Sequence, residues 1–199
     1  MAREVAGKLP YASACFGAHG LPVPGWSDTP NCVSGVRFLE AFNGGRLQVT
    51  ASKVICVGGG DTSVDVVSVA RRLGKIKNIR EKDRAERVIG GYAAHDSAMA
   101  AVREGAEVTL TALFDREAMT ATETEVDDAL TEGVRVLNGV MPIGLIRNGD
   151  GRAVGLQLAR CIIDEKGIPI PQEGTEFEVE ADLIVSAIGQ GGDLTGLEE

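Results

Sequence analysis

Lys53-Val-Ile-Cys-Val-Gly-Gly-Gly-Asp-Thr-Ser-Val-Asp65 joins an apolar segment to three glycines and then to a helix-forming segment. Residues 54–57 are typical of a buried parallel strand, and the segment after Gly60 predicts a long helix. Gly58 allows a tight reversal between them, and Gly60 leaves no side chain between the backbone and a phosphate group. The first amides of the helix then face an anion, assisted by roughly half a positive charge from the helix dipole. This order predicts a turn that binds a pyrophosphate.

The glycine turn has two interpretations, nucleotide binding and a purely structural strand-to-helix turn. The third small position of the dinucleotide pattern is Ser63 rather than Gly, and serine still permits close packing of the helix on the strand. The strand before the glycines and the helix after them favour nucleotide binding. The candidate pyrophosphate-binding residues are Gly58, Gly59, Gly60, Asp61, Thr62 and Ser63.

The chain after residue 53 alternates strand, helix, strand, helix, strand, which predicts an α/β fold with a Rossmann-like parallel sheet. Gly74 is expected to end the first helix, and the second strand begins at Glu107. Thr122-Glu-Thr-Glu125 is a capping box that opens the second helix, which Gly133 closes before a third strand at 134–137. The remainder predicts an antiparallel β-meander from strands at 140–147, 153–163 and 176–180, followed by a buried strand at 182–189.

Two segments stand outside this pattern. Residues 1–50 hold four of the seven prolines and predict a turn-rich connector, with one short helix over 34–42. Residues 75–104 interrupt the nucleotide-binding pattern as an insertion. Its charged part, 75–87, is interpreted as a solvated loop, and 95–104 has the composition of a short helix.

The composition sets limits on function. A chain of 199 residues that is 44% apolar is long enough for one α/β domain with a substantial core. The formal charge of −9 argues against binding to nucleic acid or to an anionic membrane. No apolar run approaches the ~20 residues of a membrane helix, and the first residues carry no signal-peptide pattern. A cytoplasmic protein is therefore expected.

The usual chemical side chains form no recognisable site. The cysteines are scattered without a C-x-x-C pair, which is not the spacing of an iron–sulfur run, a zinc site or a redox dithiol. No metal is therefore expected in this chain, and Cys56 is interpreted as a small buried hydrophobe. His19 and His95 stand alone. The carboxylates of the second helix are interpreted as solvated, so no catalytic acid or base is expected; they are Glu123, Glu125, Asp127 and Asp128.

A nucleotide-binding βαβ unit followed by a meander that closes on Ser186-Ala-Ile-Gly-Gln190 resembles the NAD(P)H domain of pyridine-nucleotide flavin oxidoreductases. The closest resemblance is to the branch typified by the small subunit of glutamate synthase. The branch pattern G-G-G-N-T-x-x-D is matched at 58–60, Thr62 and Asp65, with Asp61 in place of Asn. Two ATG-like segments are also similar, Ala14-Cys-Phe-Gly-Ala-His19 and Val185-Ser-Ala-Ile-Gly-Gln190.

This resemblance implies a domain inserted into a flavin domain, with an ATG-like segment at each crossing. Residues 1–50 would then be connector and partial flavin-domain segment, 51–190 the NAD(P)H-binding domain, and 191–199 the start of the return. The parent protein would bind FAD and iron–sulfur clusters, although no cluster ligand lies in this chain. The implied partners are a nicotinamide nucleotide, the flavin domain of the parent chain and a redox partner protein.

The resemblance also implies a function. The domain would pass hydride between nicotinamide and FAD, and electrons would continue to iron–sulfur or protein partners. The nicotinamide end would lie at Ala187, Ile188, Gly189 and Gln190. Such a domain is expected to be inactive alone because it lacks the flavin domain's own fingerprint. The insertion and the closing Gly191-Gly-Asp-Leu194 resemble the flavoprotein group associated with dissimilatory sulfite reductase, which implies a role in sulfur metabolism.

The choice between NADH and NADPH depends on the end of the second strand. The branch usually carries a Tyr-Arg-Arg triplet there, whose arginines bind the 2′-phosphate of NADPH. This chain has Ala112-Leu-Phe114 instead, followed by Asp115 and Arg116. An acid about 20 residues beyond the glycines, discounting the insertion, binds the free 2′-hydroxyl of NADH. NADH is favoured, with either Asp115 or Arg116 at the adenosine ribose.

Two other functions stay open. The chain could be a non-catalytic module that binds a nucleotide or docks a subunit, with the insertion and the proline-rich segment serving a partner protein. It could also be a Rossmann domain for another adenine cofactor, such as S-adenosylmethionine.

Overall fold

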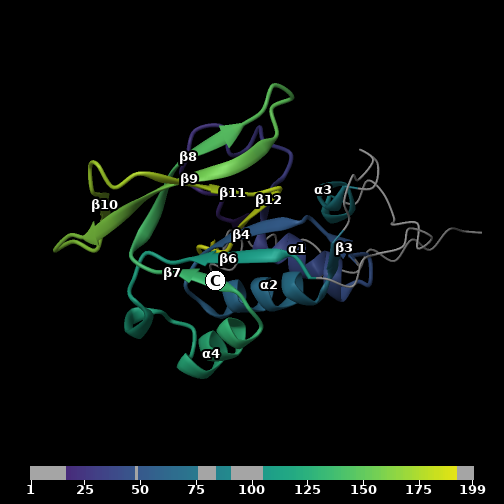
Figure 1. The fold of residues 1–199 in the computed structure, drawn as a ribbon, viewed down its shortest axis with the longest axis horizontal. Coiled ribbons are helices and arrows are strands. Elements are labelled where there is room, and N and C mark those ends of the chain that lie inside the picture. Colours follow the sequence, from purple (N-terminus) through teal and green to yellow (C-terminus); the bar gives the residue numbers. More distant parts are fainter. Residues whose placement is uncertain (1–16, 48, 76–83, 91–104, 192–199) are drawn as a thin grey trace, which may run out of the picture.

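A five-stranded parallel sheet forms the centre of the molecule, in the order β2-β12-β4-β6-β7 (Figure 1). The computed structural model describes residues 17–47, 49–75, 84–90 and 105–191. The strands of this sheet are β2 (Cys32–Ser34), β4 (Lys53–Val57), β6 (Glu107–Thr111), β7 (Arg135–Leu137) and β12 (Leu183–Ser186). Helices cover one face of the sheet and an antiparallel meander covers the other.

The helical face carries α1 (Gly35–Asn43), α2 (Asp61–Arg72) and α4 (Glu123–Thr131). Because side chains alternate along a strand, Val54 and Cys56 of β4 point into this helical core, where they join Val66 and Val67 of α2. The capping box at the start of α4 is formed, with the Thr122 hydroxyl accepting from the Glu125 amide. α2 packs against β4, β6 and α4.

The opposite face carries the meander of β8 (Val140–Arg147), β9 (Ala153–Ile163), β10 (Pro169–Pro171) and β11 (Phe177–Glu180). Leu156 and Leu158 of β9 are fully buried against Ile55 of β4 and Ile184 of β12. The side chain of Asn31 joins the layers, since it donates to the carbonyls of Ala153 and Asp182 and accepts from the Ala153 amide. The meander is thus held rigidly over the parallel sheet.

Two short ladders complete the fold. β1 (Gly17–Ala18) pairs antiparallel with β13 (Gln190–Gly191), so the described part of the first ATG-like segment lies beside the end of the second. β3 (Val49–Thr50) pairs parallel with β5 (Gly74–Lys75). The described part also contains α3 (Ala85–Ile89) and a 3-10 turn, η2 (Arg116–Ala118).

The predicted fold class is confirmed, including the parallel sheet, the meander and the helix expected at 34–42, which spans 35–43. Two local expectations were wrong. α2 ends at Leu73 in extended backbone, and Gly74 pairs with Val49 instead of closing the helix. α3 forms at the end of the expected loop 75–87 because its apolar side chains enter the helical core.

A connector is predicted over residues 1–50. In its described part, β2 joins the parallel sheet and Phe38 and Leu47 are buried in the helical core. The division of the chain into domains stays a prediction. The helix expected over 95–104 lies outside the described residues. In the described part, no helix combines the length and apolarity needed to cross a bilayer.

Candidate functional site

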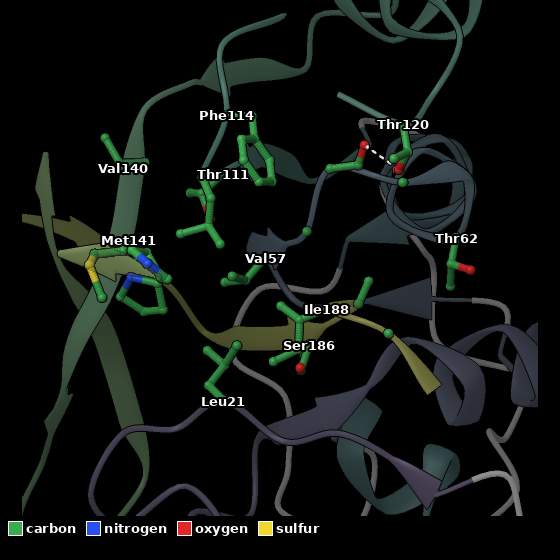
Figure 2. Close-up of a pocket in the computed structure, with 18 of the residues that line it drawn as sticks. Leu21, Val57, Thr62, Thr111, Phe114, Thr120, Val140, Met141, Ser186 and Ile188 are labelled. Atoms are coloured by element: carbon green, nitrogen blue, oxygen red, sulfur yellow. Dashed lines mark hydrogen bonds between the residues drawn. The ribbon is translucent and has the colours of Figure 1, made fainter. Parts of the chain in front are cut away.

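A cavity of about 540 Å³ opens at the carboxyl ends of β4, β6 and β12. This is the edge at which open α/β sheets bind ligands, and the volume lies within the usual range of ligand pockets. Figure 2 shows the start of α2 with Thr62 at one end of the cavity, and Val140 and Met141 of β8 at the other.

The glycine turn is fixed by its neighbours on both sides. The Gly58 amide donates to the Thr111 carbonyl at 2.9 Å, and the Ala187 amide donates to the Val57 carbonyl at 2.8 Å. Gly58 has φ +153°, and a Cβ there would lie 2.5 Å from the Ala187 carbonyl oxygen. No side chain fits at this position, so the glycine is required by the close approach of β12.

The start of α2 presents unused donors. Gly60 is the N-cap, and its carbonyl accepts from the amides of Ser63 and Val64. Among the described residues, the amides of Gly60, Asp61 and Thr62 have no hydrogen-bond partner. These three amides are free to receive an anion, as expected for a helix start.

A loop from β6 to α4 forms the wall beside these amides. The Gly59 carbonyl accepts from the amides of Thr120 and Ala121, both at 3.1 Å. A Cβ at Gly60 would meet the Thr120 hydroxyl at 3.1 Å. The space in front of α2 is therefore kept open by the absence of a side chain at Gly60.

The structure brings most of the predicted pyrophosphate residues together. Those that line the cavity are Gly58, Gly59, Gly60, Asp61 and Thr62. Ser63 lies behind them: it is fully buried, its hydroxyl bonds to the Gly60 carbonyl, and the Cys56 thiol contacts the Ser63 carbonyl at 3.7 Å. Ser63 therefore packs α2 on β4, which is the part expected of the third small residue.

The predicted nicotinamide-end residues begin beside the glycine turn, where Ala187 approaches Gly58. Ala187, Ile188 and Gly189 line the cavity, and Gln190 follows them in β13. The Ser186 hydroxyl donates to the His19 carbonyl at 2.7 Å, and the His19 amide donates to the Gly189 carbonyl at 3.4 Å. These bonds join the end of β12 to the segment after β1.

The predicted ribose-binding residues are not part of the cavity wall. Asp115 is exposed, and its negative charge is one of the causes that raise the pKa of the Cys161 thiol, after burial. The Arg116 guanidinium pairs with Asp127. Leu113 and Phe114, which precede them, line the cavity instead. The roles of Asp115 and Arg116 stay predictions.

Thr111 is a cavity residue that sequence reasoning missed. The residue is 0% exposed and its hydroxyl has no hydrogen-bond partner, although Thr111 is among the residues that line the cavity. A buried hydroxyl left unpaired costs about 1–3 kcal/mol. Alternation along β6 put Thr111 on the meander face, but nothing in the sequence indicated that Met141 and Pro142 would lie opposite it.

The described cysteines, Cys32, Cys56 and Cys161, form no disulfide. Burial raises the pKa of the Cys32 thiol to about 12, against a smaller opposite effect of Arg147. Burial also raises the pKa of the Cys56 and Cys161 thiols. No group of metal-ligating side chains comes together within the ranges that the structure describes. The cavity thus offers amides and hydroxyls, which fit the phosphates and ribose hydroxyls of a dinucleotide.

Comparison with known proteins identifies similar sequences along most of the chain. A family model described as pyridine nucleotide-disulphide oxidoreductase matches residues 13–199. The NADPH-Fe(3+) oxidoreductase subunit beta of Geobacter sulfurreducens is 32% identical over 167 residues, which are 81% of this chain and 20% of that protein. The Azospirillum brasilense glutamate synthase [NADPH] small chain is 30% identical over 168 residues, 81% of this chain and 28% of that protein.

A third relative, the NADP(+)-dependent formate dehydrogenase subunit beta of Moorella thermoacetica, is 33% identical over 172 residues, 83% of this chain and 20% of that protein. The chain thus spans about a fifth to a quarter of the length of these relatives.

Solved structures share the fold. Mycobacterium tuberculosis FprA in complex with NADPH superposes with a TM-score of 0.53 at 16% identity, covering 87% of this chain and 48% of that one. The thioredoxin reductase of T. acidophilum superposes with a TM-score of 0.52 at 12% identity, covering 90% of this chain and 44% of that one. The predicted likeness to two-dinucleotide-binding flavoproteins is confirmed at the level of the fold.

Proposed function

The chain belongs to the pyridine nucleotide-disulphide oxidoreductase family, and from that membership we propose that it is the NAD(P)H-binding domain of a flavin-dependent oxidoreductase. The observation that carries the proposal is the group of unpaired amides of Gly60, Asp61 and Thr62, which open into a cavity at the carboxyl edge of the sheet. A pyrophosphate is the group of a dinucleotide that such amides bind best.

The two nucleosides would extend from the pyrophosphate in opposite directions. The end of β6, at Phe114, would hold the adenosine end, and Ala187 to Gly189 would hold the nicotinamide end. A nicotinamide nucleotide supplies a hydride when it is bound. The residues of this chain orient it and keep water away, for which an acid or base is not needed.

The pairing of β1 with β13 supports the proposal that this domain is inserted into a flavin domain. Two segments that both lead to the same neighbouring domain should lie side by side, as Gly17 and Gly191 do. We propose that the inserted domain also includes β2 and α1, which the division at residue 50 leaves outside. FAD, iron–sulfur clusters and a redox partner protein would belong to the longer parent protein, and so would the role in sulfur metabolism.

The preference for NADH over NADPH stays a prediction, and the names of three relatives point the other way because they specify NADPH or NADP(+). In favour of NADH, Phe114 lines the cavity where the resemblance expects an arginine, and Arg116 is paired with Asp127. A guanidinium that is already paired gains less from a 2′-phosphate than a free one.

The test is calorimetry on the 199-residue chain with NADH, NADPH and S-adenosylmethionine. We expect saturable binding of NADH, with NADPH weaker. Addition of FAD and NADH without oxygen to the longer parent protein then separates two functions, because the domain alone is expected to be inactive: bleaching of the flavin absorbance indicates the oxidoreductase, and binding without bleaching indicates a nucleotide-binding or docking module. Binding of S-adenosylmethionine alone would contradict the proposal.

Asp61→Asn is expected to tighten dinucleotide binding about two- to fivefold. The Asp61 carboxylate is exposed at the first position of α2 and lines the cavity, where it would repel the pyrophosphate. Two unit charges ~4 Å apart in water interact by about 1 kcal/mol. The same substitution should lower the stability of the free protein slightly, since an acid at a helix start is favourable. Calorimetry and urea unfolding measure the two effects.

Asp65→Asn is the matched control, because Asp65 is exposed on the same helix but does not line the cavity. The gain in dinucleotide affinity of Asp61→Asn should shrink as salt is added, because salt screens the repulsion between exposed charges. Weaker binding by Asp61→Asn would mean that the carboxylate contacts the ligand directly.

A further inference from the structure

The cavity has two halves of different chemistry. The glycine half is formed by the glycine turn, Asp61, Thr62 and Thr120. The meander half is lined by Leu21, Val57, Thr111, Phe114, Val140 and Met141. Figure 2 shows Thr111, Val140 and Met141 on the side of the view opposite to Thr62 and Thr120, with Val57 and Phe114 nearer its centre. The meander half is apolar except for one hydroxyl.

That hydroxyl belongs to Thr111, and its position is set by the register of the sheet. Ser186, Val57 and Thr111 lie side by side on β12, β4 and β6. The Ser186 hydroxyl is already bonded to the His19 carbonyl, whereas the Thr111 hydroxyl is fully buried and unpartnered. A buried polar group that borders a cavity is expected to find its partner in the molecule that fills it.

The shape and chemistry of this half favour a flat heteroaromatic ring. Apolar side chains from both layers of the fold would cover its faces, and Phe114, 43% exposed, offers an aromatic surface for stacking. A threonine hydroxyl both donates and accepts, so it can bond to either kind of atom on the polar edge of a base. The end of the second strand is where dinucleotide folds hold the adenosine end.

We propose that Thr111 is the polar contact of the adenine ring, which the meander half of the cavity encloses. This rests on the proposed function and deepens it, because it replaces charge recognition at Asp115 and Arg116 by recognition of the base itself. Affinity for the adenosine half would then come from burial and one hydrogen bond, whichever nicotinamide cofactor is used.

The test compares Thr111→Val with the wild-type 199-residue chain by calorimetry, using NADH, ADP and nicotinamide mononucleotide. Valine keeps the shape and removes the hydroxyl. We expect NADH and ADP to bind about fivefold more weakly, the effect of losing a hydrogen bond worth ~1 kcal/mol, and nicotinamide mononucleotide to be unaffected. The melting temperature of the free protein should stay the same or rise, because an unpaired buried hydroxyl is gone.

Thr50→Val is the matched control. Thr50 is also fully buried with an unpartnered hydroxyl, but it lies on β3 and does not line the cavity. Thr50→Val should change the melting temperature as Thr111→Val does, and it should bind every ligand with the affinity of the wild type. Thr111→Ser, which keeps the hydroxyl, should bind NADH within about twofold of wild type.

The outcomes separate the two proposals. If the wild-type chain binds NADH and Thr111→Val binds it equally tightly, the role of Thr111 is overturned and the proposed function stays intact. A loss shared equally by nicotinamide mononucleotide also overturns it, because the hydroxyl would then not be specific for adenine. Failure of the wild-type chain to bind NADH or ADP overturns the proposed function together with this inference.

Discussion

Gly60→Val is expected to abolish dinucleotide binding while leaving the fold intact. Gly60 has φ −107° and ψ 177°, which is extended backbone open to valine, so the substitution introduces no backbone strain. Its side chain, however, would fill the space between the Thr120 hydroxyl and the free amides of α2. Charge-assisted hydrogen bonds contribute ~1.5–3 kcal/mol each, so loss of two or three should weaken binding about a hundredfold or more.

Calorimetry with NADH measures the loss, and circular dichroism during heating checks the fold. Gly149→Val is the matched control, since Gly149 has open space around it and lies in the β8–β9 turn, outside the cavity lining. Both variants should melt close to the wild type, and only Gly60→Val should lose NADH. Tight binding retained by Gly60→Val would remove the glycine turn from the site and with it the basis of the proposed function.

The parts of the fold that were predicted correctly are those encoded locally. The strand, turn and helix from Lys53 to Arg72 depend on apolar residues and glycines that are neighbours in sequence. The capping box of Thr122 and Glu125 likewise acts within one turn of helix. The β8–β9 hairpin is closed by the Asn148 side chain, which accepts from the amides of Asp150 and Arg152. Each of these signals is complete without knowledge of the rest of the chain.

The expectations that were wrong depend on partners far away in sequence. Gly74 was read as a helix terminator because glycine often ends helices, but its backbone pairs with Val49. The charged run before α3 suggested solvent, yet Val88 and Ile89 are buried, and Glu86 forms an ion pair with Arg152 of the β8–β9 turn. No pattern within 75–89 reveals that a hairpin 66 residues later supplies the partner for that charge.

The residues of the candidate site divide in the same way, into those that a local motif identifies and those that only the packing of distant segments brings together. The residues from Gly58 to Thr62 are contiguous, so a local motif was enough to identify them. Asp115 was chosen by its distance in sequence from the glycines, and a count of residues does not say on which side of the strand end a side chain will lie. Thr111 and Met141 come from two layers of the fold and line one cavity, and only the packing of the layers makes Thr111 a candidate partner of a ligand.

Gly58→Ala is expected to destabilise the protein by about 2–5 kcal/mol, the sum of backbone strain and overpacking. An alanine Cβ would lie 2.5 Å from the Ala187 carbonyl oxygen, at a φ of +153° that side chains rarely adopt. Neither atom can move freely, because Gly58 bonds to β6 and Ala187 bonds to β4 through their amides. Relief of the clash therefore has to separate β12 from β4 in the middle of the sheet.

Urea unfolding measures this effect as a lower midpoint with an unchanged dependence on denaturant. Gly59→Ala is the matched control, since a Cβ there would be in ordinary contact with the side chains of Ala112 at 3.4 Å and Met119 at 3.6 Å, and no left-handed backbone is involved. If Gly58→Ala were no less stable than Gly59→Ala, β12 would not approach the turn closely enough to require glycine. The wall formed by Ala187 to Gly189 would then lie further from the helix start, and one dinucleotide would no longer be expected to contact both.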